Sequence, residues 1–179
     1  QYVGLSFKLL RRVNSADFGL KRKVSNMVQS GVFLGSNERR KWISFVSLTE
    51  MIDYKPSELI VMSMCRAHFC EQVGIQIGRK VDSEAFFLAG MFSLLDTMMD
   101  MRMENALENM QIPDLTRKAL MENENLGSWV LNLIKSLENG GWDNADTLAN
   151  LLRLKYQQVF DIYYDALEWS NDLINNITP

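Results

Sequence analysis

The sequence predicts an all-α protein with about eight to ten helices in a single domain that covers residues 1–179. Apolar residues recur at helical spacing in nearly every segment, and the alternation of apolar and polar residues that marks a β-strand is absent. Apolar residues make up 47% of the 179 residues, which is enough for a sizeable core. No internal repeat and no long linker divides the chain, so we expect short loops to join the helices within one domain.

Capping and turn-forming residues set the expected boundaries in the first third of the chain. The first helix is expected to end at Asn14 and Ser15, because Asn tolerates the left-handed conformation and both side chains can bond local backbone groups. Gly35 ends the second helix, and the hydroxyl of Ser36 can cap the third. A fourth helix starts at Pro56, because a first turn does not need the N–H that proline lacks.

Similar signals set the later boundaries. Asp82 or Ser83 starts a helix, Pro113 separates two short helices, and Gly140 with Gly141 ends another. The expected helices cover residues 1–14, 25–34, 36–48, 56–78, 82–95, 103–110, 114–121, 126–137, 144–152 and 154–174.

Charge is unevenly distributed along the chain. Residues 1–41 hold nine Lys or Arg and two Asp or Glu, a balance of +7. The rest holds ten Lys or Arg and twenty Asp or Glu, a balance of −10, which together gives the net charge of −3. The overall acidity argues against a general affinity for nucleic acid. The two regions could attract each other, or the basic region could serve as a docking face.

Three features bear on the compartment and on the ends of the chain. Cys65 and Cys70 lie five residues apart in one expected helix, which is poor geometry for a disulfide, so we expect buried thiols in a reducing cytoplasm. No apolar run approaches the roughly 18 residues that span a membrane, and no secretory signal opens the chain. Because Gln1 lies inside an expected helix, we interpret the chain as an N-terminally truncated fragment of a longer protein.

A search for catalytic groups finds little. His68 is the only histidine, which excludes a metal site of several imidazoles, and a lone helical histidine is more often a packing or surface residue than a ligand. No P-loop, dinucleotide fingerprint or nucleophile elbow is present. Asp96 and Asp100 are four residues apart on an expected helix and could share a cation. They could equally form a helix edge that faces water, and we favour that interpretation.

A set of short segments occurs in a characteristic order and spacing. They are LLRRVNSA at 9–16 followed by Phe18 and Gly19, the residues Val28, Leu34 and Gly35, RRKW at 39–42 and FLAGMF at 87–92. Together they resemble the HDOD domain, the HD-related output domain of bacterial signalling proteins, over almost the whole chain. KPSEL at 55–59 and FSLLD at 92–96 are most similar to HDOD regions that follow an EAL domain. EAL domains are the family associated with hydrolysis of cyclic di-GMP.

The resemblance implies an HD-like fold that has lost its metal site. In metal-dependent HD enzymes the helix at 87–92 leads to adjacent His and Asp residues, and the corresponding positions here are Ser93 and Leu94. Another histidine would be expected near Met62. Methionine is a poor ligand for such divalent ions, and leucine cannot be one. Without a metal ion to lower the pKa of a bound water, no nucleophile forms at neutral pH. The resemblance therefore implies no catalytic residue, no metal and no cofactor.

Other positions are expected to serve the fold or to form contact surfaces. Gly90 is expected at a close helix–helix contact, and the remaining signature residues with a structural role are Asn14, Ser15, Gly19 and Gly35. A possible interaction face, which could also be ordinary solvated surface, consists of Arg11, Arg12, Lys21, Arg22, Lys23, Arg39, Arg40 and Lys41. A helix rich in aromatic residues could hold a partner, although its spacing favours core packing. Its members are Tyr156, Phe160, Tyr163, Tyr164 and Trp169.

These features lead us to expect a non-catalytic regulatory or output domain of a bacterial signal-transduction protein in the cytoplasm. Its partner would be another protein or its own EAL domain preceding Gln1, and we expect a link to cyclic di-GMP signalling. We expect no contact with a membrane. A homodimer is possible. One alternative is a residual metal-dependent phosphohydrolase of the HD superfamily, which would need residues such as His68, Glu71, Asp96 and Asp100 to converge. Another, less favoured, is a regulator that binds nucleic acid through the basic N-terminal region, with strong salt dependence.

Overall fold

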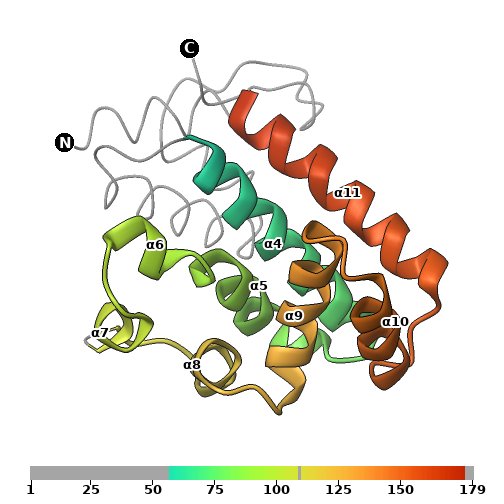
Figure 1. Ribbon diagram of the computed structural model, residues 1–179, viewed down its shortest axis with the longest axis horizontal. Helices are drawn as coiled ribbons and strands as arrows, with labels where there is room; N and C mark the ends of the chain where they lie inside the picture. The colour runs from blue at the N-terminus through green and yellow to red at the C-terminus, as the bar shows by residue number, and fades with distance from the viewer. Residues whose placement is uncertain (1–56, 109, 176–179) are drawn as a thin grey trace, which may run out of the picture. The chain divides into compact units, whose positions relative to one another are not determined.

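The structure, a computed structural model, describes residues 57–108 and 110–175 (Figure 1). These ranges contain eight α-helices and one short 3-10 helix, with no strand among them, which confirms the predicted all-α class. The helices are α4 (Ser57–Gln76), η2 (Lys80–Asp82), α5 (Ser83–Phe92), α6 (Leu95–Met99), α7 (Met103–Leu107), α8 (Asp114–Met121), α9 (Leu126–Glu138), α10 (Trp142–Leu151) and α11 (Tyr156–Asn175). The helices predicted within residues 1–48 lie outside the described residues.

Residues Lys55–Ser170 form one compact unit, and α4 runs through its centre (Figure 1). Residues 63–71 of α4 are buried without interruption. A helix that is covered on all sides carries apolar residues around its whole circumference rather than along one stripe. The core cluster draws Phe69 and Val73 from α4, Leu131 and Ile134 from α9, and further side chains from α10 and α11.

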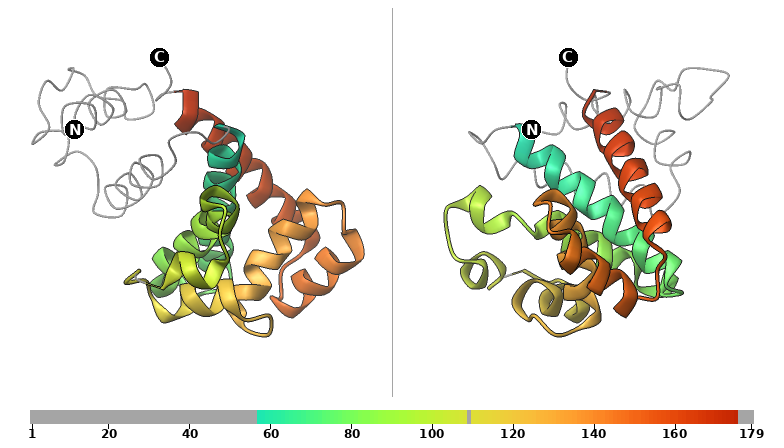
Figure 2. Two further views of the ribbon diagram at one scale, coloured as in Figure 1. Left: turned by 60° about the vertical axis from the view of Figure 1, so that its left-hand side comes forward. Right: turned by 45° about the vertical axis from the view of Figure 1, so that its right-hand side comes forward.

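Helix α11 runs alongside α4, as the views in Figures 1 and 2 show. The ring of Tyr163 on α11 meets the edge of Phe69 on α4, with centroids 6.2 Å apart and planes at 81°. Val159 and Ala166 of α11 are fully buried in the same core cluster. The side of α11 that carries these residues is therefore its core-facing side.

Helices α4 and α5 cross in direct backbone contact at Gly90. A Cβ atom at this position would overlap the carbonyl group of Arg66 and would lie 2.6 Å from the Cα of Ala67. Such distances lie well inside van der Waals contact, so only glycine fits here. The contact fixes the C-terminal end of α5 against the middle of α4.

The helix expected over residues 82–95 is interrupted. Helix α5 ends at Phe92, and α6 begins at Leu95 after a turn in which the N–H of Ser93 bonds the carbonyl of Gly90 at 3.2 Å. Helix α6 ends at Met99, and its C-cap residue Asp100 has a left-handed φ of 52°. Asp96 thus lies in the first turn of α6 and Asp100 is its C-cap residue, whose backbone N–H bonds the carbonyl of Asp96.

The other described boundaries lie close to the predicted ones. Helix α8 has the bounds expected, with Pro113 as its N-cap residue, and α9 ends one residue later than predicted. Asn125 caps α9 through a reciprocal bond pair with Ser128, which satisfies backbone N–H groups at the helix start. Within the described residues, no helix is long and apolar enough to cross a membrane.

Candidate functional site

A buried arginine lies between two of the positions at which metal ligands would be expected from the resemblance. Arg66, in the middle of α4, is only 7% exposed. Its Nη1 donates to Ser93 Oγ at 3.0 Å, and its Nη2 lies 3.6 Å from Met62 Sδ, one turn earlier on α4. Leu94 is half-buried at the start of α6. The structure thus gathers Met62 and Ser93 around a guanidinium group.

Glu138, at the end of α9, neutralises this arginine. Arg66 Nε donates to both carboxylate oxygens at 3.0 Å, and Nη2 donates to Oε2 at 2.6 Å. The side chains of Arg66 and Glu138 are 9% and 12% exposed. Paired, bidentate geometry of this kind gives the strongest hydrogen bonds available to a guanidinium group. It also offsets the large cost of removing both charges from water.

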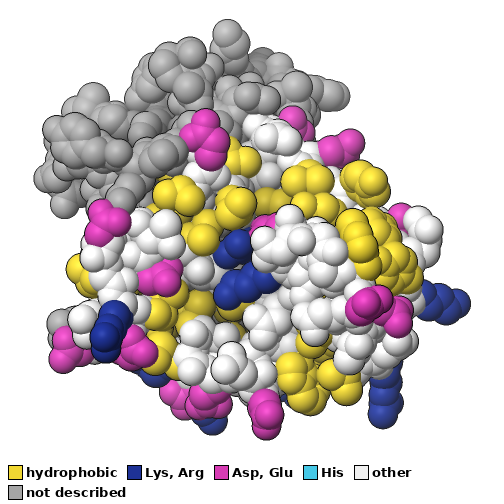
Figure 3. Space-filling model, in the orientation of Figure 1, with side chains coloured by type: hydrophobic (Ala, Val, Ile, Leu, Met, Phe, Trp, Pro, Cys, Tyr) yellow, Lys and Arg dark blue, Asp and Glu magenta, His cyan; other side chains and the backbone are white. Residues whose placement is uncertain are grey.

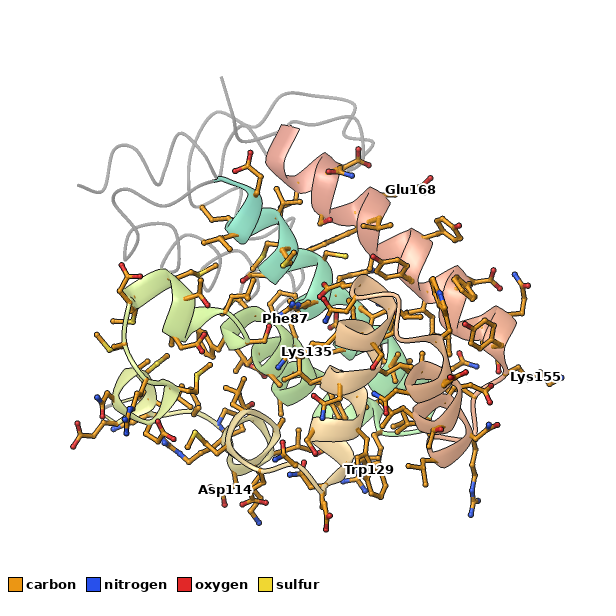
Figure 4. All side chains as sticks on the ribbon, in the orientation of Figure 1. Phe87, Asp114, Trp129, Lys135, Lys155 and Glu168 are labelled. Carbon is orange, nitrogen blue, oxygen red and sulfur yellow. The ribbon has the colours of Figure 1, made fainter. Side chains whose placement is uncertain are left out.

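Lys135 adds a second cation near this pair, one turn before Glu138 on α9. Burial lowers the pKa of Lys135 below its ordinary value, and the charge of Arg66 lowers it further. Figure 3 shows Lys or Arg side chains in the middle of the viewed face, and Figure 4 labels Lys135 in that area. The cluster of Arg66, Lys135, Ser93 and Glu138 is called the arginine site below.

The carboxylates near the arginine site do not form a ligand set. Asp96 Oδ1 accepts the backbone N–H of Thr97 at 2.7 Å, in the first turn of α6. Asp100 is exposed at the other end of that helix. Across residues 57–108 and 110–175, no three His, Cys, Asp or Glu side chains are grouped so that they could hold a metal ion. Hard divalent cations need several such oxygen or nitrogen ligands at once.

His68 packs α4 against α11. Its Nε2 lies 2.8 Å from Asp165 Oδ2, and its ring stacks on Trp169 with centroids 4.6 Å apart and planes at 10°. Its Nδ1 lies 4.0 Å from a carboxylate oxygen of Glu71. His68 is buried, whereas the Asp165 side chain is 64% exposed. The histidine therefore joins two helices and is a packing residue in this fold.

The two cysteines are free and buried, as the sequence predicted. Burial raises the pKa of the Cys65 thiol to about 11, and the negative charge of Glu138 raises it too. The pKa of Cys70 is also raised, chiefly by burial. Because the thiolate is the reactive form of cysteine, neither side chain is suited to nucleophilic chemistry at neutral pH.

The sequence-predicted interaction face lies outside the described residues. This applies to Arg11, Arg12, Lys21, Arg22, Lys23, Arg39, Arg40 and Lys41, and to the signature residues Asn14, Ser15, Gly19 and Gly35. Their roles remain predictions.

Arg66, Lys135 and Glu138 were not singled out from the sequence. Arg66 interrupts a run of apolar and small residues in α4, and an isolated charge in such a run indicates a buried ion that needs a partner. That signal identifies the arginine. It does not identify Glu138, which lies 72 residues further along the chain.

Comparison with known proteins places the chain in context. A sequence model described as the HDOD domain matches residues 2–131. The chain is 30% identical over 176 residues to the uncharacterized protein YuxH of Bacillus subtilis (strain 168). It is 31% identical over 173 residues to the cyclic di-GMP phosphodiesterase CdgJ of Vibrio cholerae serotype O1. Each match covers 97% of this chain but only 42% and 40% of the respective relative, so the chain spans about two fifths of the length of these curated relatives. No solved structure matches.

Proposed function

Because this chain belongs to the HDOD domain family, we propose that it is a non-catalytic regulatory or output domain of a bacterial signal-transduction protein. It acts in the cytoplasm through contacts with another protein or with a neighbouring domain, and it is linked to cyclic di-GMP signalling. The similarity to the cyclic di-GMP phosphodiesterase of V. cholerae supports that link. Any phosphodiesterase activity would belong to another part of a longer protein, such as an EAL domain preceding Gln1.

The arginine site is the observation that carries the non-catalytic assignment. Arg66 places a permanent positive charge between Met62 and Ser93, and that charge is already paired with the carboxylate of Glu138. A divalent ion at the same place would meet electrostatic repulsion from the guanidinium. It would find a thioether and a hydroxyl, which bind such ions poorly. A hydrolytic site of the HD kind needs the metal to generate its nucleophile, so this chemistry favours a domain that works by contact.

The metal content of the purified chain tests this proposal. Cells are grown with added manganese, iron and nickel, and the protein is analysed by elemental mass spectrometry together with an assay for cyclic di-GMP hydrolysis. We expect well under one ion per chain and no turnover above buffer. Any retained metal is located by comparing Asp96→Asn, close to the arginine site, with the matched control Asp114→Asn, an exposed aspartate in the first turn of α8.

One or two tightly held ions per chain that are lost in Asp96→Asn, but kept in Asp114→Asn, would contradict the proposal. Turnover of cyclic di-GMP that follows the metal content would contradict it as well. Metal that is lost equally in both variants would reflect binding to exposed carboxylates, whereas one or two tightly held ions that neither variant loses would also contradict the expectation of a domain without bound metal.

A further inference from the structure

An open cleft lies between the start of α10 and the start of α11. It has a volume of about 460 Å³ and is lined by Trp142, Asp143, Asp146 and Tyr156. Trp142 is 53% exposed and Tyr156 is 37% exposed. Its lining thus combines two aromatic faces with two carboxylates. This cleft is separate from the arginine site, which is built from α4, α5 and α9.

An aromatic stripe continues from the cleft along the solvent side of α11. Tyr156, Phe160 and Tyr164 are spaced four residues apart, so they share one face of the helix. Phe160 lies 4.8 Å from Tyr156, 6.4 Å from Tyr164 and 6.3 Å from Trp142, measured between ring centroids. Tyr164 is 63% exposed. Figure 3 shows hydrophobic side chains gathered over α10 and α11 at the right of the view, with acidic side chains beside them.

The aromatic residues of α11 fall into two sets, one that packs inside the domain and one that faces solvent in the stripe. Tyr163 packs against the core, and Trp169 stacks on His68, so core packing is confirmed for these two. The prediction of core packing is wrong for Tyr156 and Tyr164, whose side chains are exposed to solvent. Large exposed aromatic residues in a contiguous group are typical of an interaction surface rather than of ordinary protein surface.

Among the described residues, the cleft supplies negative charge that no Lys or Arg side chain neutralises through an ion pair. Asp143 and Asp146 are both exposed, and the described Lys and Arg side chains form no ion pair with either of them. Asp146 Oδ2 accepts a neutral bond from Asn150 Nδ2 at 3.2 Å. Lys155, although next to Tyr156 in sequence, extends away from the molecule at the right edge of Figure 4. Within the part of the chain that the structure describes, both carboxylates are therefore open to an incoming cation.

We propose that this cleft binds an arginine side chain presented by a segment of a partner protein, whose flanking apolar residues lie on the aromatic stripe. A guanidinium group can stack on the face of Trp142 or Tyr156 while it pairs with an aspartate through two N–H groups. A lysine ammonium lacks the planar fork, and an anion would be repelled by both carboxylates. The inference rests on the proposed function for its biological purpose, because it gives the proposed contacts a location. Its binding test does not depend on that function.

The test uses NMR titration of the full 179-residue chain with a short peptide, acetyl-Ala-Arg-Leu-Ala-amide. The reference is the same peptide with neutral citrulline in place of arginine. The indole N–H signal of Trp142 is assigned from its absence in Trp142→Phe. We expect a saturable shift of this signal with the arginine peptide, and at least a fivefold weaker response to the citrulline peptide. The double variant Asp143→Asn, Asp146→Asn should lose at least fivefold in affinity for the arginine peptide.

A matched double variant, Glu104→Gln and Glu108→Gln, removes two exposed charges on and beside α7, and we expect it to bind as the parent does. All four substitutions are on exposed side chains, and circular dichroism melts confirm that each variant is folded. The proposal is overturned if the Trp142 signal does not saturate, if citrulline binds as well as arginine, or if both double variants weaken binding equally. It is also overturned if the signal depends on protein concentration without peptide, because the stripe would then be covered by a second copy of the chain.

None of these outcomes depends on metal content or on cyclic di-GMP turnover. A domain that bound metal would refute the proposed function and leave the cleft untouched. A cleft that ignored arginine would refute only this inference.

Discussion

Replacing Arg66 with methionine should destabilise the domain strongly. The substitution keeps the length and apolar stem of the side chain but removes the guanidinium. Glu138, whose side chain is 12% exposed, then loses its three bonds with Arg66 and stays desolvated, with Lys135 one turn earlier on α9 as a nearby cation that does not replace those bonds. Removing one partner of a buried ion pair typically costs about 3–5 kcal/mol. We expect a loss in this range for Arg66→Met and also for Glu138→Leu.

The double variant Arg66→Met, Glu138→Leu should recover most of this loss. With both charges of the pair gone, neither Arg66 nor Glu138 is left buried alone beside Ser93 and Lys135, and such apolar replacements of an ion pair are often neutral or stabilising. We therefore expect the double variant to lie within about 1.5 kcal/mol of the parent, far from the sum of the two single losses. The measurement is urea denaturation followed by circular dichroism, with the m-value checked for constancy.

Arg79→Met is the matched control for this experiment. Arg79 pairs with Asp82 at 2.6 Å, but its side chain is 51% exposed, so its removal should cost less than about 1 kcal/mol. A loss of stability below about 1 kcal/mol for Arg66→Met would refute the reasoning. It would show that the substitution does not leave a buried, unpaired charge on Glu138. Strict additivity in the double variant would refute it equally, because the two side chains would then not be coupled.

Three further outcomes follow from the packing and from the pKa shifts. Gly90→Ala forces a Cβ into the backbone of α4 and should cost at least about 1–3 kcal/mol in urea unfolding. Gly141→Ala, whose Cβ would meet nothing closer than 3.5 Å, should cost less than about 1 kcal/mol, since Gly141 is the N-cap of α10 and alanine caps less well, and a cost equal to that of Gly90→Ala would contradict the close contact. The raised pKa of Cys65 means that the folded chain keeps the thiol proton between pH 9 and about 11 while the unfolded chain loses it. Cys65 should therefore contribute a fall in stability of about 3 kcal/mol at most across this window, beside the fall from Cys70, so the pH profile of Cys65→Ala should be less steep and a parallel profile would count against this account. Neither Cys65 nor Cys70 should react with an aromatic disulfide reagent at pH 8 before urea unfolds the chain, and rapid labelling of the native protein would show that the thiols are accessible.

Local signals in the sequence predicted those features of the fold that local interactions decide. Pro113 before α8 and the glycine pair after α9 act through their own backbone, so their effect is visible without knowledge of the tertiary structure. The break between α5 and α6 carries no glycine or proline, and its residues read as one continuous apolar helix. The Ser93 hydroxyl at that break bonds Arg66, which is 27 residues away. A tertiary contact of this kind leaves no local signature.

The same distinction applies to the candidate sites. The resemblance singled out Met62 and Ser93, but not the arginine that contacts both. The aromatic residues of the last helix were recognised as a group, yet periodicity alone could not decide which of them face the core. That depends on where Trp142 of α10 lies, since its ring meets Phe160 on the outer side of the helix. Tertiary packing decides which helices pair across a large separation in sequence, and the local periodicity of one helix does not record that choice.

The crossing at Gly90 has a consequence for how this domain can move. Helices that pack through side chains can slide past each other by small amounts in shear motions. At Gly90 no layer of side chains separates the helices, since the α5 backbone rests on the backbone of α4 at Arg66 and Ala67. The two helices must therefore shift together, as one lever. We expect relative movement of α4 to be easier against α9 and α11, which it meets through side chains, than against α5 at this crossing.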